Sequence, residues 1–246
     1  MKIYGLIGYP LSHSFSQLYF NQKFQKESIS DCRFDLMPIE QIEQFPVLLR
    51  EIAGIKGLAV TIPYKEDIIP YLSELDSNAK EIQAVNCIII TKDGLKGFNT
   101  DVIGFEKSIA PLIKPHHKKA LILGSGGSSK AVAFFLKKSG IDFLIVSRNK
   151  SNLSNYITYT DIDEDLMMQY NLVVNCSPVG QFPDVEKRPD IPYQFVTPQH
   201  LFFDLIYNPV KSNFLEMAEL KGAIIKNGRE MLEIQAEENW KLWNQN

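Results

Sequence analysis

Lys65 and Asp101 are two residues in the amino-terminal part of the chain whose types suit proton transfer. Lys65 closes the run VTIPYK, just after an apolar segment, and Asp101 closes the run GFNTD. An ammonium held in place by a neighbouring carboxylate can give a proton to a reacting oxygen or take one from it. Hydroxyl and amide side chains at the ends of apolar segments suit a polyhydroxylated substrate; the candidates are Ser14, Ser16, Thr61 and Asn86.

Each of these residues also has a purely structural interpretation. The serines and the aspartate can cap helices, the asparagine can serve in a turn, and the lysine can be a solvated surface residue. His13 lies between two serines and is interpreted as a hydrogen-bonded structural histidine. His116 and His117 are interpreted as solvated residues of a connector. Spacing alone leaves the functional and structural interpretations of the polar set open.

Alternating apolar and helical segments predict the elements that must position these side chains. Apolar segments that predict strands lie at residues 3–7, 32–37, 57–62 and 85–91. Segments with helical spacing lie at residues 16–25, 39–52, 67–72 and 73–84. Ligands of open α/β sheets gather at the carboxyl ends of strands. We therefore predict an α/β substrate-binding and catalytic domain over residues 1–103.

A glycine-rich turn predicts a nucleotide site in the second half of the chain. The apolar segment 120–123 precedes the turn, and a helix-like segment follows it up to Gly140, a candidate C-cap. Such a turn lets a pyrophosphate approach the backbone and the amino end of the helix. An ordinary tight turn between a strand and a helix is the alternative. The cofactor-binding candidates in the turn are Gly124, Ser125, Gly126, Gly127 and Ser128.

Strand and helix segments continue to alternate after this turn. Strands are predicted at residues 142–146, 172–176, 201–206 and 223–225, and helices at residues 214–220 and 228–243. The polar segment up to about residue 165 is predicted to be irregular, and the proline-rich stretch 181–199 to be a loop with helical turns. This alternation predicts a Rossmann-like parallel sheet with helices on both faces, over residues 104–228. The fold class is therefore α/β with two lobes.

The end of the strand that follows the glycine turn and its helix indicates which cofactor binds. In an NAD site an acidic residue about 20 residues after the turn binds the ribose 2′-hydroxyl. Here the segment reads Ser147-Arg148-Asn149-Lys150, and the next acidic residue is Asp161. The guanidinium of Arg148, with Lys150 adding charge, suits the 2′-phosphate of NADP(H), which we predict as the cofactor. The alternative is that Arg148 and Lys150 are a solvated loop pair.

Composition excludes several classes of protein. Of the 246 residues, 45% are hydrophobic and 22% charged, and the net charge of −3 comes without long blocks of like charge. These values are typical of a globular protein and argue against a nucleic-acid or membrane-surface binder. Cys32, Cys87 and Cys176 have no metal-ligand or disulfide spacing, which predicts no metal site and a reducing, cytoplasmic location. The pattern of a signal peptide and a bilayer-length apolar run are both missing.

Seven short runs form an ordered series along nearly the whole chain. They are GYPLSHSFS at residues 8–16, VTIPYK at 60–65, AVNC at 84–87, GFNTD at 97–101, the glycine turn at 124–127, the basic segment at 147–149, and a tail made of 204–209 and 227–232 with Gln235. In this order, the runs resemble the motifs of the shikimate dehydrogenase family. Any single run is a weak signal, whereas the ordered series is highly specific.

The resemblance implies a reversible, NADP-linked reduction of 3-dehydroshikimate to shikimate, on the route to chorismate and the aromatic amino acids. It implies that Lys65 is the acid/base group, with Asp101 beside it. The residues implied to hold the carboxylate and hydroxyls of this small-molecule substrate are Ser14, Ser16, Thr61, Asn86, Asp101, Tyr207 and Gln235. The cofactor-binding set also takes in Ser147 and Gly228. The last helix, residues 229–246, is expected to pack on residues 1–103, and the protein to be a monomer or homodimer.

This chain departs from the common pattern of the family at several positions. Gln17 stands where the family commonly has proline, Ala59 where it has asparagine, and Cys87 and Ser212 where it has threonine. Ser147 replaces the asparagine that begins the basic segment. The serines and the lysine and aspartate pair are intact, so activity is expected, while substrate breadth and cofactor preference stay open.

Three other functions are compatible with parts of the sequence. One is a quinate/shikimate dehydrogenase that also uses NAD, against which Arg148 argues. Another is a non-catalytic paralogue that binds shikimate, against which the intact Lys65 and Asp101 argue. Without the resemblance, two α/β lobes and a lysine also suit a folate-type methylene dehydrogenase.

Overall fold

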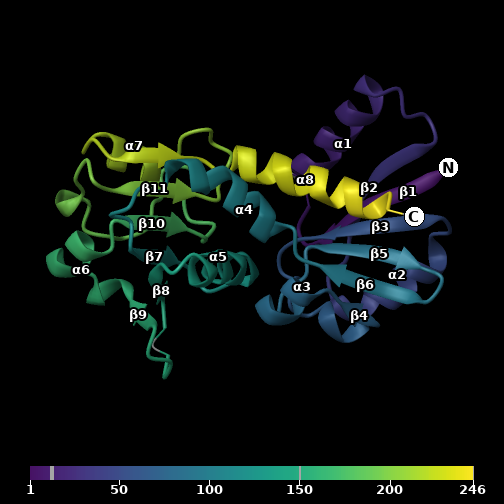
Figure 1. Cartoon of the computed structure of the whole chain (residues 1–246). Coiled ribbons are helices and arrows are strands. Elements are labelled where there is room, and N and C mark those ends of the chain that lie inside the picture. Colours follow the sequence, from purple (N-terminus) through teal and green to yellow (C-terminus); the bar gives the residue numbers. More distant parts are fainter. Residues whose placement is uncertain (12–13, 150, 246) are drawn as a thin grey trace. The chain divides into compact units, whose positions relative to one another are not determined.

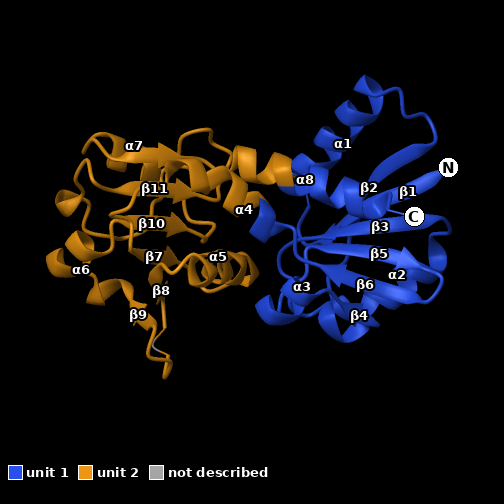
Figure 2. Cartoon of the chain, viewed as in Figure 1, with its two compact units in different colours: residues 1–103, 235–246 blue, residues 104–234 orange. Residues whose placement is uncertain are grey.

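The chain forms two compact units in a computed structural model that describes residues 1–11, 14–149 and 151–245. Unit 1 consists of residues 1–103 and 235–246, and unit 2 of residues 104–234 (Figure 2). Each unit contains one six-stranded sheet with helices, so the predicted α/β class is confirmed. The chain enters unit 2 within α4 (Asp101–Ile109) and returns to unit 1 within α8 (Arg229–Trp243).

Unit 1 is built on a mixed sheet with the strand order β2-β1-β3-β5-β6-β4 (Figure 1). Its strands are β1 (Lys2–Gly8), β2 (Cys32–Pro38), β3 (Ile55–Val60), β4 (Glu74–Leu75), β5 (Cys87–Thr91) and β6 (Gly94–Phe98). Its helices, besides α8, are α1 (Phe15–Lys26), α2 (Phe45–Glu51) and α3 (Ser77–Ile82), with short 3₁₀ turns η1 (Ile42–Gln44) and η2 (Ile69–Tyr71).

The pairing directions decide which strand ends meet. β1 is parallel to β2 and β3, whereas β5 is antiparallel to both β3 and β6. The carboxyl ends of β1, β3 and β6 and the amino end of β5 therefore lie at one edge of the sheet. Residues just outside those four ends are brought close together even though they come from distant parts of the sequence.

Both faces of the unit 1 sheet are buried, because side chains of a strand alternate between its faces. Ile3 and Ile7 of β1 belong to one apolar cluster and Tyr4 to another on the opposite face. The second cluster includes Trp243 of α8, whose ring stacks on Tyr4 at a centroid distance of 5.1 Å. Gly57 leaves room for this tryptophan, since a Cβ there would lie 2.1 Å from Trp243 Cδ1.

Unit 2 is a Rossmann-like sheet in which all neighbouring strands are parallel, in the order β12-β11-β10-β7-β8-β9. Its strands are β7 (Lys119–Leu123), β8 (Asp142–Ser147), β9 (Tyr156–Thr158), β10 (Leu172–Asn175), β11 (Leu201–Asp204) and β12 (Ile224–Lys226). Its helices are α5 (Gly127–Lys138), α6 (Glu164–Gln169) and α7 (Asn213–Glu219), with 3₁₀ turns η3 (Ala110–Leu112), η4 (Tyr159–Asp161) and η5 (Tyr193–Phe195).

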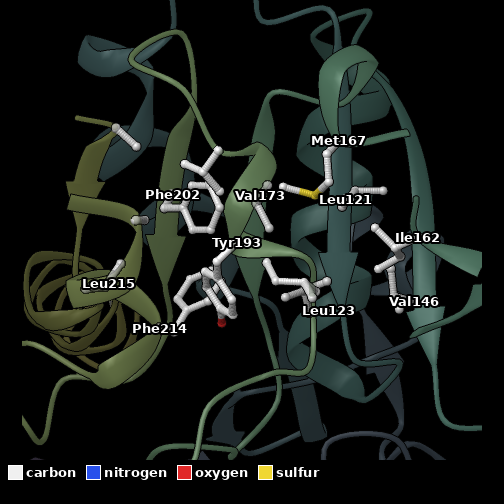
Figure 3. Close-up of a cluster of buried hydrophobic side chains, with 14 residues drawn as sticks. Leu121, Leu123, Val146, Ile162, Met167, Val173, Tyr193, Phe202, Phe214 and Leu215 are labelled. Atoms are coloured by element: carbon white, nitrogen blue, oxygen red, sulfur yellow. The ribbon is translucent and has the colours of Figure 1, made fainter. Parts of the chain in front are cut away.

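The core of unit 2 follows from apolar strands whose side chains stand in register. Val173 of β10 pairs with Leu121 of β7 on one side and Phe202 of β11 on the other, and all three are fully buried in one cluster (Figure 3). Apolar runs of this kind are typical of parallel strands covered on both faces. Strand order reverses between β7 and β10, which is where ligands bind in open α/β sheets.

The structure differs from the sequence prediction in several short elements. The segment 73–84, predicted to be helical, contains strand β4 before α3, because Glu74 and Leu75 pair with β6. The polar segment before residue 165 contains β9, which pairs with β8 over only three positions. Helix α6 begins close by, capped by Asp163, whose side chain accepts a hydrogen bond from the Leu166 amide. Elements this short carry little periodic signal.

The prediction that His117 is solvated was wrong, since this residue is 2% exposed. Its Nδ1 accepts a hydrogen bond from the Lys114 amide, and its Nε2 lies 3.1 Å from the carbonyl oxygen of Gln199. Burial lowers the pKa of this imidazole. His116 is exposed, and His13 lies outside the described residues. Within the described ranges, no helix is long and apolar enough to cross a membrane.

Candidate active site

Lys65 and Asp101 form an ion pair at the edge of the unit 1 sheet where four strand ends meet. Lys65 follows β3 and Asp101 begins α4 just after β6. The Lys65 Nζ lies 2.5 Å from Asp101 Oδ2, and the two side chains are only 12% and 8% exposed. A pair removed from water to this extent keeps a fixed geometry that a solvated surface pair does not.

Asn86 holds the other oxygen of this carboxylate. Its Nδ2 donates to Asp101 Oδ1 at 2.8 Å, while its Oδ1 accepts from the backbone amide of Thr100 at 2.7 Å. Asn86 is placed just before β5, and β5 runs opposite to β3. Its side chain therefore arrives at the same edge as Lys65 and prevents the carboxylate from turning away from the ammonium.

Gln235 joins this group from the far end of the sequence, through helix α8. Its Oε1 lies 3.4 Å from Asn86 Nδ2. We call these four residues (Lys65, Asn86, Asp101 and Gln235) the Lys65 cluster. Two buried partners of the cluster, Thr100 and Asn239, were not among the sequence candidates. Thr100 lies within the GFNTD run, and Asn239 is one helical turn after Gln235, a spacing that places both on one face.

Ser14, Ser16 and Thr61 follow β1 and β3 at the same edge of the sheet. Ser14 occupies the N-cap position of α1, yet its side chain makes no cap hydrogen bond. Its Oγ is buried and has no hydrogen-bond partner among the described residues. The capping interpretation of Ser14 is therefore weakened. Hydrogen bonds found within the described ranges do not join these three side chains to the Lys65 cluster.

The glycine turn of unit 2 leaves open space at the amino end of α5. Gly126 is the N-cap residue and no side chain caps the helix there. A Cβ built on Gly126 meets no atom within 4 Å. Gly124, by contrast, has φ +109° and lies against the chain after β10, where a Cβ would be 3.2 Å from the Ser177 amide nitrogen. An uncapped helix terminus beside open space fits the pyrophosphate of a dinucleotide.

The basic segment after β8 carries an exposed cation. Ser147 ends the strand, and its hydroxyl donates to the Asn149 carbonyl at 2.5 Å. Arg148 is exposed and lies near Tyr159: burial raises the pKa of this tyrosine, Cys176 adds to the rise, and the positive charge of Arg148 opposes it. An exposed guanidinium fits the 2′-phosphate of NADP. The predicted Lys150 lies outside the described residues.

Tyr207, a predicted substrate residue, and Gly228, a predicted cofactor-binding residue, belong to unit 2, while the other predicted substrate residues belong to unit 1. Tyr207 lies in the segment after β11. The Gly228 amide donates to the Ile206 carbonyl at 3.0 Å. A Cβ at Gly228 would lie 2.1 Å from the Leu205 carbonyl oxygen, so close packing of two backbone segments requires glycine there.

A second buried polar group, centred on Asp204, lies at the end of β11. Its carboxylate accepts from Asn175 Nδ2 at 3.0 Å, from the Ile206 amide at 3.0 Å and from the Ser212 hydroxyl. Asp204 is fully buried, which raises its pKa to about 6 although these hydrogen bonds oppose the shift. The side chains fix the start of the segment that carries Tyr207. Among the described residues, no group of His, Cys, Asp or Glu is arranged to hold a metal ion.

Comparison with known proteins gives a consistent result for the whole chain. Residues 6–88 match the family described as the shikimate dehydrogenase substrate binding domain. A shikimate dehydrogenase (NADP(+)) from Caldanaerobacter subterraneus subsp. tengcongensis is 35% identical over 258 aligned residues, covering 98% of this chain and 91% of that protein.

Solved structures agree with the sequence comparison. A chorismate mutase/shikimate 5-dehydrogenase fusion protein from Clostridium acetobutylicum superimposes with a TM-score of 0.89 at 33% identity, over 99% of this chain and 91% of the other. The shikimate 5-dehydrogenase of Thermus thermophilus, solved in complex with NADP(H) and shikimate, gives a TM-score of 0.87 at 26% identity, over 99% of this chain and 94% of the other.

Proposed function

This chain belongs to the shikimate dehydrogenase family, and we propose that it catalyses the reversible NADPH-dependent reduction of 3-dehydroshikimate to shikimate. The observation that carries this proposal is the buried Lys65–Asp101 pair, whose Nζ–Oδ2 distance is 2.5 Å. The family relationship supplies the reaction, and this pair supplies the proton that the reaction needs.

Lys65 acts as the acid in the direction of reduction. When bound, NADPH supplies a hydride to the ketone carbon of the substrate, and negative charge develops on the ketone oxygen. The Lys65 ammonium stabilises this charge and gives the oxygen a proton, forming the hydroxyl of shikimate. In the reverse direction, neutral Lys65 removes that proton. Asp101 and Asn86 keep the lysine in place throughout.

The substrate is held by hydroxyl and amide groups around this pair. Its carboxylate and hydroxyls are bound by Ser14, Ser16, Thr61, Asn86, Asp101, Gln235 and Tyr207. The buried Oγ of Ser14, which has no partner among the described residues, supports a role in binding. The departure at Ala59 bears little on these contacts, because that residue is 6% exposed and packs in an apolar cluster of unit 1.

NADP(H) is bound by unit 2. The turn Gly124–Ser128 and the uncapped start of α5 hold the pyrophosphate, which the open space beside Gly126 supports. Arg148 binds the 2′-phosphate with the help of Ser147, and Gly228 borders the same site; the part proposed for Lys150 rests on the sequence alone. We place the enzyme in the cytoplasm as a monomer or homodimer. Cys32, Cys87 and Cys176 form no disulfide within the described residues, which agrees with a reducing compartment.

A spectrophotometric assay of NADPH oxidation with 3-dehydroshikimate tests the proposal. The wild type is expected to turn over, and Lys65→Ala to lower kcat by roughly two to four orders of magnitude, as for lost acid–base catalysis. Lys96→Ala is the matched control, since Lys96 is also ion-paired in unit 1, with Glu74, and should leave kcat unchanged. A Lys65→Ala enzyme within a few-fold of wild type would contradict the role of this lysine.

The same assay separates the competing functions. Comparable turnover of quinate, or of NAD(H) in place of NADP(H), would indicate the broader quinate/shikimate dehydrogenase. Tight binding of shikimate without any NADPH oxidation would indicate a non-catalytic paralogue. We expect neither, because both the lysine pair and the Arg148 cation are in place.

A further inference from the structure

Asn239 is a buried amide that the proposed chemistry does not use. It lies on α8 one helical turn after Gln235 and is 1% exposed. Its Oδ1 lies 2.6 Å from Thr100 Oγ1, and its Nδ2 lies 3.3 Å from Gln235 Oε1. A buried primary amide destabilises the folded protein unless its polar atoms have hydrogen-bond partners.

The donors and acceptors around Asn239 can be assigned by starting from a group whose role is certain. The backbone amide of Thr100 can only donate, so the atom of Asn86 that it meets at 2.7 Å is the oxygen. Asn86 Nδ2 therefore faces the other way and donates to Asp101 Oδ1 and to Thr100 Oγ1, at 2.8 and 2.9 Å. The Thr100 hydroxyl, having accepted this bond, has one proton left to give.

The Thr100 hydroxyl donates that proton to Asn239, and this bond determines the orientation of the remaining amides in the series of hydrogen bonds. The distance of 2.6 Å between Thr100 Oγ1 and Asn239 is typical of O–H···O bonds and short for N–H···O bonds, so the Asn239 oxygen faces Thr100. Asn239 Nδ2 must then face Gln235, at 3.3 Å from its Oε1. Asn86 Nδ2 also lies 3.4 Å from that atom, but its two hydrogens already go to Asp101 and Thr100. Asn239 is therefore the donor that requires the oxygen of the Gln235 amide to face it.

We propose that Asn239 is a positioning residue that holds the Gln235 side chain with its oxygen inward, so that the Nε2 donor is the group presented to a substrate hydroxyl. The inference rests on the proposed function, in which Gln235 contacts the substrate. It adds a specificity determinant: the amide of Gln235 acts as a hydrogen-bond donor because a residue one turn away prevents it from rotating to present its oxygen.

A double-mutant cycle tests whether Asn239 acts through Gln235. Asn239→Leu keeps the size of the side chain and removes its polar atoms, and the Thr100 hydroxyl can turn to Asn86 Oδ1 at 3.2 Å. This variant is expected to raise KM for shikimate about five- to tenfold, the value of one neutral hydrogen bond, with KM for NADP+ and kcat within about twofold. In a Gln235→Ala background the same substitution should change KM for shikimate by less than about twofold.

Two results would overturn the inference: an Asn239→Leu enzyme with unchanged KM for shikimate, or an increase of equal size in the Gln235→Ala background. If Asn239→Leu fails to fold, Asn239→Asp replaces it, because it keeps an acceptor for Thr100 and puts an oxygen opposite the Gln235 oxygen; the same cycle and outcomes apply. Asn244→Asp, an exposed change on the residue after α8, controls for added charge. A wild type unable to oxidise shikimate would overturn the proposed function itself.

Discussion

The candidate sites of the two units are built from different parts of the chain. In unit 1 the candidate site is made of side chains that are joined by hydrogen bonds. Asn86, Asp101 and Gln235 are buried, and the Lys65 side chain is 12% exposed. In unit 2 the candidate cofactor site is made largely of backbone, with an uncapped helix start and open space beside Gly126. Recognition by side chains depends on residue identity, whereas recognition by backbone depends on keeping side chains away.

This comparison teaches where substitutions should matter. An isosteric change in unit 1 removes a donor or acceptor and leaves its buried partner without a hydrogen bond, which destabilises the site. In unit 2 the same kind of change is tolerated unless it adds atoms to the glycine turn or removes the Arg148 charge. The following predictions would sharpen or break this contrast, from the largest expected effect to the smallest.

Asp101→Asn should give the largest loss of activity after Lys65→Ala. The substitution keeps the shape of the side chain but replaces one acceptor with a donor, so that either Lys65 or Asn86 faces a group that cannot accept its hydrogen. We expect kcat/KM for shikimate to fall roughly a hundredfold or more. Steady-state kinetics beside Asp93→Asn, an exposed turn residue, measure this effect. Equal kinetics for the two variants would remove the distinction between the units.

Arg148→Ala should weaken NADP(H) selectively. Loss of a charge-assisted hydrogen bond to the 2′-phosphate predicts a rise in KM for NADP+ of about ten- to a hundredfold, with KM for NAD+ unchanged. Arg188→Ala is the control, because Arg188 is also an exposed arginine of unit 2 and lies over the Tyr193 ring. An equal rise in KM for both cofactors would show that Arg148 does not bind the 2′-phosphate.

Gly126→Val should affect cofactor binding without affecting the fold. Its φ is −83° and nothing lies within 4 Å of a Cβ there, so valine fits the free protein and occupies the space of the pyrophosphate. We expect KM for NADP+ to rise about tenfold or more while Tm stays within about 2 °C of wild type.

Gly124→Ala is the counterpart of this change. With φ +109° and the Ser177 amide 3.2 Å from the added Cβ, it should lower Tm instead. Thermal unfolding monitored by circular dichroism separates the two glycines. A Gly126→Val protein that binds NADP+ normally would contradict a backbone site at this turn.

Asp204→Asn should act on stability rather than on activity. The pKa of this carboxyl is about 6 in the folded protein and ordinarily 3.8, so the folded state binds the proton more tightly than the unfolded state. Its contribution to the free energy of unfolding is therefore present below pH 4 and is lost as pH rises through 6, by roughly 3 kcal/mol at most.

The asparagine variant lacks this pH dependence. Urea unfolding of wild type and Asp204→Asn between pH 4 and pH 7 should show wild-type stability falling relative to the variant as pH rises, with kcat changed by less than about twofold. An unchanged difference in stability across this range would mean that Asp204 does not titrate as described. A large loss of kcat would mean that this group of unit 2 also takes part in the chemistry.

The approach of Lys65 to Asp101 was predictable only in part. Lys65 follows a predicted strand, and the carboxyl ends of parallel strands meet, whereas β6, the strand that precedes Asp101, was not among the predicted strands. The sequence did not predict the antiparallel course of β5, which brings Asn86 to the same edge from the amino end of its strand. The pairing of strands depends on contacts between distant segments, which local periodicity does not record.

Asn239 and Asp204 could not be predicted for a different reason. Each lies in a segment whose pattern is otherwise ordinary, and each acquires its role only from the residues that surround it after folding. Asn239 meets Thr100, 139 positions earlier in the chain, and Asp204 meets Asn175, 29 positions earlier. The one local signal was the spacing of Asn239 from Gln235, which placed them on one helical face.

The discontinuity of unit 1 has a consequence for biosynthesis. Its core includes Trp243, whose indole nitrogen donates to the Ile88 carbonyl at 3.1 Å, so the unit needs residues 235–246. During translation those residues leave the ribosome after every strand of unit 2 has been made. Domains usually fold in the order of their synthesis. Here the first unit to begin emerging is completed only after the second, because α8 is encoded more than a hundred codons downstream. Until α8 is made, the face of the sheet that it shares with α1 is only partly covered.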